Sequence, residues 1–294
     1  MEFAYTTEQE ALRQEVQQFI ADNVDGPVRD EIANTDEMSQ GPLVRDLRKK
    51  VAEKGWVGIS WPKEYGGQDG SRIDQYIVEE EFSRIGVGVG GAGSGAPAIL
   101  AAGTEEQKKT LLPGLISGEI TLALGFTEPQ AGADLASLQC RAVKDGDEYV
   151  INGQKMYTSS AHYASHIYLM ARTDPDAPKH RGISIFIFPM DTPGITVRPL
   201  WTIQNDPPAP IGTTYGQRRT NETFFEDVRV PATCMLGEEN QGWYVGAMGL
   251  NLDRVGASRY LISVRRDEDI INWAKENDLG GHEVGQDPAI RDRL

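Results

Sequence analysis

Hydroxyl-bearing, aromatic and small side chains gather in two short stretches between residues 121 and 160. Thr127-Glu-Pro129 follows an apolar run and leads into a loop of small residues that ends at Asp134. Tyr157-Thr-Ser159 comes after an intervening hairpin and the turn dipeptide Asn152-Gly153. On neighbouring strands of a β domain, the two stretches would line one cleft with hydroxyls, backbone donors and an aromatic face. A flat, polar heterocycle needs such a cleft, so the sequence predicts a binding site here.

Other kinds of site have less support in the composition. The net charge of -15 and the pI near 4.8 argue against nucleic acid as a partner, because nucleic acid requires a concentrated basic surface. Cys140 and Cys234 are the two cysteines, and neither has metal-ligand spacing around it. The four histidines are scattered, so we predict no metal site and a reducing compartment.

The first 120 residues carry the patterns of helices. Apolar residues recur at helical spacing within residues 7–22, and Thr7 with Glu10 predicts a capping box at the start of that helix. Thr104 with Gln107 predicts another cap. The remaining predicted helices are 42–55, 71–84, 96–102 and one from Thr104 to Ile116.

From Thr121 the pattern changes to short strands separated by turns. At least six apolar strands are expected, and no long helix interrupts them. An antiparallel sheet or barrel is therefore predicted in place of a parallel α/β sheet. Asp145-Gly146 and Asn152-Gly153 predict tight turns on either side of one strand, and residues 204–215 predict a long loop.

A long helix is expected from Trp243 to about Lys275, and a further helix begins at Pro288. The fold class is thus predicted as α+β, with a helical domain over residues 1–120 and a β domain over residues 121–236. Residues 237–294 are expected to begin a second helical domain. Since the last predicted helix simply stops at Leu294, we expect the chain to lack the rest of that domain.

The segment Gly86-Val-Gly-Val-Gly-Gly91 has the spacing of a dinucleotide-binding motif. That motif should follow a strand, whereas this segment follows a predicted helix. We interpret it as a helix junction. The small residues from Gly86 to Ala96 also suggest space for a bulky or ring-bearing ligand.

A series of motifs, in order and at matching spacing along almost the whole chain, resembles the acyl-CoA dehydrogenase family of flavoproteins. The motifs are Trp61-Pro-Lys-Glu-Tyr-Gly-Gly67, Gly103-Thr-Glu-Glu-Gln107, Phe126-Thr-Glu-Pro129 with Ala131-Gly-Ala-Asp134, Asn152-Gly-Gln-Lys155, Phe225-Glu-Asp-Val-Arg-Val-Pro231, Leu236-Gly-Glu238 and Leu252-Asp-Arg254. Each short motif alone is weak, and their order and spacing together carry the resemblance.

The resemblance implies FAD as cofactor and α,β-dehydrogenation of an acyl-CoA thioester in the β-oxidation of lipids. A carboxylate removes the proton next to the thioester carbonyl, the β carbon gives a hydride to the flavin, and an electron-transfer flavoprotein takes the electrons. It also implies a homo- or hetero-oligomer, a dimer or tetramer. The acidic N-terminus shows no signal peptide, and no apolar run of transmembrane length occurs, so we expect a cytoplasmic protein.

The resemblance assigns roles to individual residues. Phe126 and Thr127 fall where family members hydrogen-bond the pyrimidine edge of the flavin. Tyr157 falls where a tryptophan commonly packs against the flavin, and Thr158 and Ser159 continue that motif, with Ser159 at the hydroxyl position near flavin N5. Turn capping by Thr127, a strand aromatic at Tyr157 and a solvated serine at Ser159 are the ordinary alternatives.

The catalytic base is less defined. Most family members use a glutamate in a region beyond Leu294, and one branch places it directly before an arginine on the first helix of the C-terminal domain. That position is Asp253 here, followed by Arg254, which the resemblance assigns to the pocket or to acyl-CoA binding. A structural Asp253 paired with Arg254 is the alternative. A non-catalytic or partial subunit of a heteromeric dehydrogenase and a flavin oxidase or monooxygenase therefore remain alternative functions.

Overall fold

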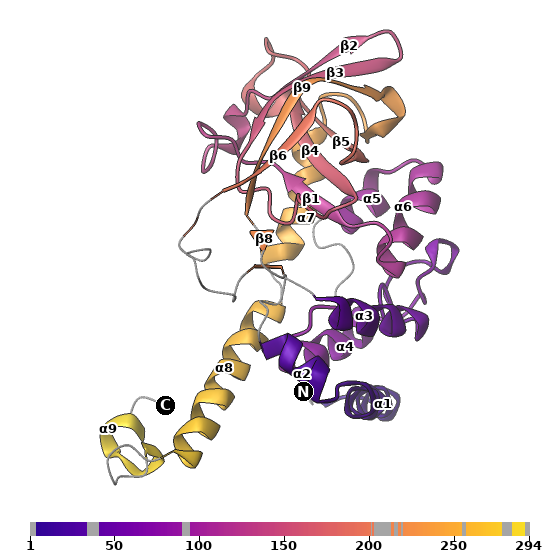
Figure 1. The fold of residues 1–294 in the computed structure, drawn as a ribbon. Coiled ribbons are helices and arrows are strands. Elements are labelled where there is room, and N and C mark those ends of the chain that lie inside the picture. The colour runs from indigo at the N-terminus through magenta and orange to yellow at the C-terminus, as the bar shows by residue number, and fades with distance from the viewer. Residues whose placement is uncertain are drawn as a thin grey trace.

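The chain combines a helical region, a twisted β-sheet and a final group of helices (Figure 1). The structure is a computed structural model that describes residues 4–33, 41–89, 95–200, 202, 213–214, 217–218, 220–254, 257–277 and 284–291. The sheet occupies the upper part of Figure 1, and α1 to α4 lie below it. The predicted α+β class is confirmed.

The helical region packs around buried apolar side chains that include Val16, Val51, Trp56 and Phe82. Its helices are α1 (Thr7–Asn23), α2 (Gly26–Ala33), α3 (Pro42–Glu53), α4 (Arg72–Arg84), α5 (Gly95–Ala102) and α6 (Glu105–Ser117). The patterns predicted all of them except α2, which is one short helix of eight residues. The predicted cap of α6 is confirmed, because the Thr104 side chain accepts from the Gln107 N–H.

The capping box predicted for α1 is wrong by one residue. Thr6, not Thr7, is the N-cap, and its side chain accepts a hydrogen bond from the N–H of Gln9. Gln9 closes the box by accepting from the Thr6 N–H at 3.0 Å. A glutamine closes a capping box as well as a glutamate does, so the sequence offered two overlapping pairs and the first of them forms.

The glycine-rich segment follows α4 and not a strand, which agrees with its interpretation as a helix junction. Gly86 has a φ of 79°, and a Cβ at this position would collide with the guanidinium of Arg265. Val87 and Val89 are buried, whereas residues 90–94 lie outside the described residues. Gly86 thus lets the chain turn where a side chain from a later helix lies against it.

The main sheet has the order β10-β5-β4-β2-β3-β9-β6, with β1 added alongside β4. Its strands are β1 (Leu122–Gly125), β2 (Arg141–Asp145), β3 (Glu148–Lys155), β4 (His166–Arg172), β5 (Ile183–Pro189), β6 (Ile195–Pro199), β9 (Asn221–Pro231) and β10 (Met235–Leu236). Most pairs are antiparallel, as predicted. Two parallel contacts add to them, because β1 pairs in parallel with β4 and a single β2–β4 pair, Arg141 with Arg172, is also parallel.

The Asn152-Gly153 dipeptide is not a turn, which corrects the prediction. It lies inside β3, where the register against β9 shifts between Ile151 and Gly153, so it forms an irregularity of the β-bulge kind. Gly153 has a φ of 151°, and a Cβ there would lie 2.7 Å from the Cα of Cys140. The tight turn predicted at Asp145-Gly146 does join β2 to β3, with Gly146 and Asp147 as its two central residues.

Two helices, and not one, occupy the region after the sheet. α7 (Gly242–Arg254) packs on β5 and α5, whereas α8 (Ala257–Glu276) packs on α4, and residues 255–256 lie outside the described residues. In Figure 1, α8 leads away from the sheet and ends beside α9 (Pro288–Arg291). The predicted loop 204–215 falls mostly outside the described residues, and β7 (Thr213–Thr214) pairs with β8 (Gln217–Arg218).

One apolar core joins the helices to the sheet. It brings Ile99 of α5, Leu112 of α6 and Val245 of α7 against Phe126 and Tyr168. Beside this core, the Gln107 side chain donates to the carbonyls of Thr233 and Met235, each at 2.8 Å. The strand ends that carry the two polar loops are therefore held against packed helices. None of the described helices is long and apolar enough to cross a membrane.

The bulge in β3 leads to a stability prediction. Gly153→Ala forces a side chain against the backbone of Cys140, whereas Gly146→Ala meets no heavy atom within 4 Å although Gly146 also has a positive φ. We expect Gly153→Ala to lower the free energy of unfolding by about 2 kcal/mol more than Gly146→Ala does. Urea denaturation of both variants measures the difference, and equal losses would contradict the tight packing at the bulge.

Candidate functional site

The two polar loops of the sequence meet at the end of β3. The N–H of Met156, the first residue after β3, donates to the carbonyl of Thr127 at 2.8 Å. One residue earlier, the Nζ of Lys155 donates to the carbonyl of Phe126 at 3.0 Å. Consecutive residues of one loop are thus bonded to consecutive residues of the other, and the predicted meeting of the two loops occurs.

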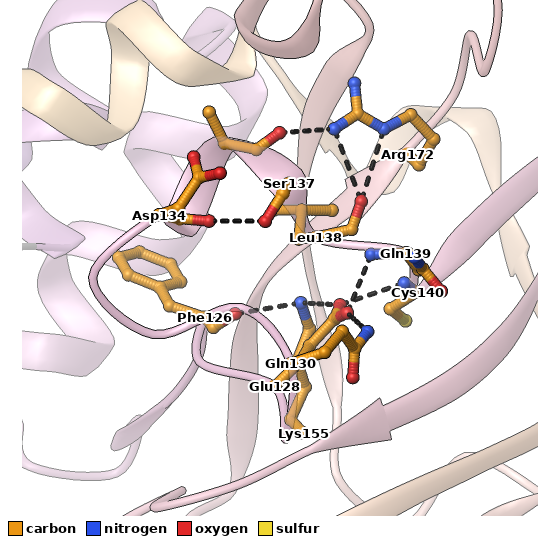
Figure 2. Close-up of polar contacts among 11 residues, drawn as sticks. Phe126, Glu128, Gln130, Asp134, Ser137, Leu138, Gln139, Cys140, Lys155 and Arg172 are labelled. Carbon is orange, nitrogen blue, oxygen red and sulfur yellow. Dashed lines mark hydrogen bonds and ion pairs between the residues drawn. The ribbon is translucent and has the colours of Figure 1, made fainter.

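A buried ion pair lies beneath this junction (Figure 2). Lys155 Nζ is 2.8 Å from Glu128 Oε1, and the side chains of Lys155 and Glu128 are 0% and 2% exposed. The carboxylate also accepts from the N–H groups of Cys140 at 2.9 Å and Gln139 at 2.7 Å, and from the Gln130 amide at 2.8 Å. Because a buried ion pair stabilises a protein only when its remaining bonding positions are satisfied, this set of partners explains why the pair is tolerated.

The same loop is held at its far end by Arg172 of β4. Its guanidinium donates to the carbonyl of Ala136 at 2.6 Å, to that of Leu138 at 3.3 Å and to that of Lys179 at 2.6 Å, and Figure 2 shows the contact with Leu138. Residues 126 to 140 therefore connect two cationic side chains, Lys155 and Arg172, that bind main-chain carbonyls. Side chains of the protein itself therefore hold this loop at both ends.

Donors at the start of the loop remain available. The structure records no hydrogen bond from the N–H groups of Phe126 and Thr127, nor from the Thr127 hydroxyl, to another described residue. The Phe126 side chain is buried and packs against Tyr168 with ring centroids 5.2 Å apart. Since a backbone N–H near a protein interior normally has a partner, these groups suit a ligand with acceptor atoms.

The second loop turns sharply. Tyr157 has a φ of 55°, its side chain is 56% exposed, and its carbonyl accepts from the N–H of Ser159 at 2.9 Å. A bulky residue with positive φ is strained, and such strain often marks a functional position. Thr158 is fully buried, and its hydroxyl has no hydrogen-bond partner in the described part of the chain.

His162 lies directly behind this turn. Its Nδ1 is 3.1 Å from the amide nitrogen of Asn221, which can only donate, so Nδ1 accepts and Nε2 carries the proton. The N–H of Thr158 donates to the Asn221 carbonyl at 2.9 Å, which connects the histidine to the turn. Burial lowers the pKa of His162, because the charged imidazolium would lose its hydration.

The structure therefore brings together Phe126, Thr127, Tyr157, Thr158 and Ser159, as the sequence predicts. Asp253 and Arg254 stand at the end of α7, but their side chains lie outside the described residues, so their predicted roles stay predictions. A cavity of about 310 Å³ opens elsewhere, between α1, α2, α4 and α8, and includes none of these residues.

Residues that hold the site were assigned no role from the sequence. Glu128 and Lys155 lie inside recognised motifs, and Arg172 directly follows the apolar run from Ile167 to Ala171. One signal was present, because Lys155 alternates with Tyr149 and Ile151, which are buried on the inner face of β3. A lysine on an inward position indicates a buried charge with a partner, and nothing in the sequence names Glu128 as that partner.

Two family profiles match most of the chain. The acyl-CoA dehydrogenase N-terminal domain matches residues 6–119, and the acyl-CoA dehydrogenase middle domain matches residues 123–228. Among curated proteins, acyl-CoA dehydrogenase FadE26 of Mycobacterium tuberculosis is 40% identical over 87% of this chain and 62% of its own length. Mitochondrial isovaleryl-CoA dehydrogenase of Pongo abelii is 36% identical over 84% of this chain and 57% of its own length. The chain thus spans about 62% of the first of these relatives.

Solved structures that are 35–38% identical to this chain share its fold. The Tcur3481-Tcur3483 steroid ACAD superposes with a TM-score of 0.83 and 38% identity, covering 99% of this chain and 72% of that chain. The ChsE4-ChsE5 complex from Mycobacterium tuberculosis superposes with a TM-score of 0.80 and 35% identity, again over 99% and 72%.

The buried pair predicts a large stability effect. Lys155→Met leaves the Glu128 carboxylate buried without its cation, so we expect the free energy of unfolding to fall by about 3–5 kcal/mol. Arg229→Met is the matched control, because Arg229 also joins two carboxylates of the sheet, Asp145 and Glu148, but at the exposed surface. Chemical denaturation should find little change in the control. A Lys155→Met loss as small as that of the control would contradict the assigned burial.

His162 predicts a pH dependence. Its folded-state pKa lies below its unfolded value of about 6.5, so its contribution to stability is fully present above that pH. The contribution is lost as pH falls from about 6.5 through the folded pKa. His162→Asn keeps an acceptor for the Asn221 amide but cannot titrate. We expect its melting temperature to fall less steeply below pH 6.5 than that of the unmodified chain, and parallel curves would contradict this assignment.

Proposed function

This chain belongs to the acyl-CoA dehydrogenase family of flavoproteins, and we propose that it binds FAD and serves the α,β-dehydrogenation of an acyl-CoA thioester. The proposal also includes transfer of the electrons to an electron-transfer flavoprotein. The match of the N-terminal and middle domains supports it, as do relatives named acyl-CoA dehydrogenases. Since the chain spans about 62% of such a relative, the activity of the whole protein is proposed and not observed.

The observation that carries the proposal is the junction of the two loops. The main-chain N–H groups of Phe126 and Thr127 and the Thr127 hydroxyl have no protein partner among the described residues, and the exposed ring of Tyr157 lies on the adjoining turn. Acceptor atoms along one edge and a flat face are the features of an isoalloxazine ring, so the residues present fit a flavin. When bound, FAD supplies the acceptor for two electrons from the β carbon of the substrate.

Each residue has a definite task in this proposal. Phe126 and Thr127 hold the pyrimidine edge of the ring, and Tyr157 packs against its face. Ser159, with Thr158 beside it, offers a hydroxyl near the reactive part of the ring. Because the loops are held by Lys155 and Arg172 before any ligand arrives, the cofactor would bind without the cost of ordering them.

Removal of the substrate proton requires a carboxylate that is not among these residues. A proton next to a thioester carbonyl is only weakly acidic, so donors to the carbonyl oxygen in a water-excluded pocket must lower its pKa. Asp253 on α7 is the candidate base within this sequence, and Arg254 is the candidate for contact with the acyl-CoA. An aspartate is one methylene shorter than the glutamate of other family members, so a base beyond Leu294 is the alternative.

We propose a bulky or ring-bearing acyl group for the substrate. One similar structure, 38% identical, is described as a steroid ACAD. In this chain the segment after α4 is rich in small residues, and a Cβ at Gly88 would meet no heavy atom within 4 Å. Comparison of reduction rates with straight, branched and ring-bearing acyl-CoA esters tests this assignment.

An assembly of two kinds of subunit is the second candidate. Relatives of this chain were solved as the ChsE4-ChsE5 complex and as Tcur3481-Tcur3483, both at 35% identity or more. In that case this chain would be a non-catalytic or partial subunit that contributes a flavin site to a dimer or tetramer. We also propose a cytoplasmic location.

One experiment separates these functions. The purified chain, alone and with a copurifying partner, is examined for flavin absorbance, and acyl-CoA is then added without oxygen. Bleaching of the flavin supports the dehydrogenase. Rapid oxygen consumption supports an oxidase or monooxygenase, and a colourless protein that gains flavin only with its partner supports the heteromeric subunit.

The hydroxyl of Thr127 leads to a binding prediction. Thr127→Val keeps the shape of the side chain and removes the hydroxyl, so we expect FAD to bind about ten-fold more weakly. Thr196→Val, at an exposed position of β6, is the control and should leave the affinity unchanged. Fluorescence titration of FAD measures both, and equal affinities would contradict the role of Thr127.

A further inference from the structure

We propose that Lys155 is a positioning residue that fixes the direction and the strength of the Thr127 N–H as a donor to the flavin. The inference rests on the proposed FAD site and assigns to the buried Glu128–Lys155 pair a role beyond holding the fold. Lys155 itself is fully buried, so it acts through the peptide group that joins Phe126 to Thr127.

The direction follows from the planarity of the peptide bond. The carbonyl of Phe126 and the N–H of Thr127 belong to one peptide group, and in a trans peptide the two point in opposite directions. Lys155 Nζ binds that carbonyl at 3.0 Å from the interior. The N–H of Thr127 must therefore point away from the lysine, and it has no partner among the described residues.

The strength follows from the charge. A hydrogen bond from an ammonium group polarises the carbonyl that accepts it, and a polarised peptide is a better donor at its N–H end. The effect is larger where water is absent, and both side chains of the pair are almost completely buried. The Thr127 N–H is thus a stronger donor than an ordinary amide, and it favours an acceptor atom that carries negative charge.

The position of the lysine is itself fixed. Glu128 binds Lys155 at 2.8 Å and is held in turn by the N–H groups of Gln139 and Cys140. On the other side of Thr127, its carbonyl accepts from the N–H of Met156 at 2.8 Å. Both peptide groups that flank Thr127 are therefore held, so the donor cannot turn away from the ligand.

The consequence concerns the reduced cofactor. A two-electron-reduced flavin carries more negative charge on its pyrimidine edge than the oxidised form does, so a strengthened donor there favours the reduced form. Removing the lysine should weaken FAD binding and lower the reduction potential. A ten-fold greater loss for the reduced form corresponds to a potential about 30 mV lower.

The test compares the unmodified chain with Lys155→Met/Glu128→Gln. This double variant removes both charges, so no unpaired ion stays buried, and the glutamine oxygen still accepts from one of the N–H groups of Gln139 and Cys140, which bond to different oxygens of Glu128. Tyr149→Phe is the matched control. Tyr149 lies on β3, as Lys155 does, and the substitution removes the hydrogen bond from its hydroxyl to Glu239 without touching the peptide between Phe126 and Thr127.

We expect FAD to bind the double variant about ten-fold more weakly and with a lower reduction potential, while the Tyr149→Phe control keeps both values. Unchanged affinity and potential in a folded double variant would overturn the role of Lys155 and leave the proposed function standing. An unmodified chain that binds no FAD, alone or with its partner, would overturn both.

A measurement on the unmodified chain covers the case in which the double variant fails to fold. Hydrogen–deuterium exchange of the segment that contains Thr127 is followed with and without FAD. We expect the Thr127 amide to exchange at least ten-fold more slowly with FAD present. Unchanged exchange at that amide, in a chain shown by its absorbance to hold FAD, would contradict the inference.

Discussion

A buried lysine–glutamate pair is the interaction on which the two loops depend. Removing two opposite charges from water is costly, and the cost is recovered only where every remaining bonding position is filled. Glu128 and Lys155 offset that cost by binding main-chain groups at both ends of the segment from Phe126 to Cys140, including the Phe126 carbonyl and the Cys140 N–H. The requirement to satisfy one ion pair therefore determines the conformation of the segment that we assign to the flavin.

The rest of the fold places this pair. Lys155 lies at the end of β3, in the interior and opposite Thr223 of β9. The irregularity at Gly153 shifts the register of β3 two residues before Lys155. β1 delivers Phe126 and Glu128 from the parallel pairing with β4, which also carries Arg172. Helices α5, α6 and α7 pack beneath Phe126, so the loop has a rigid support. The sheet thus brings the ends of several strands close together around this pair.

Much of this arrangement could be predicted from the sequence, because it depends on local patterns. Apolar periodicity predicted five of the first six helices, and a hydroxyl three residues before a glutamine predicted the cap of α6. Interactions between distant residues could not be predicted in the same way. The partner of Lys155 lies 27 residues away, and β1 pairs in parallel with β4, whose residues are 44 positions later in the chain, as for Leu122 with His166. The turn signal at Asn152-Gly153 misled because a bulge and a turn both favour asparagine and glycine.

In the candidate site, too, the residues with a local pattern could be predicted and those that act through distant contacts could not. Residue types and spacing selected Thr127 and Tyr157-Thr-Ser159, and the structure joins them through Met156. Side chains that only hold those residues, such as Arg172, carry no distinctive motif. A crystal structure of the chain with FAD tests the account most directly. The account predicts the pyrimidine edge of the flavin against the N–H of Thr127, with Tyr157 on the face of the ring. A flavin bound elsewhere, or a Thr127 N–H with no contact to it, would contradict the account.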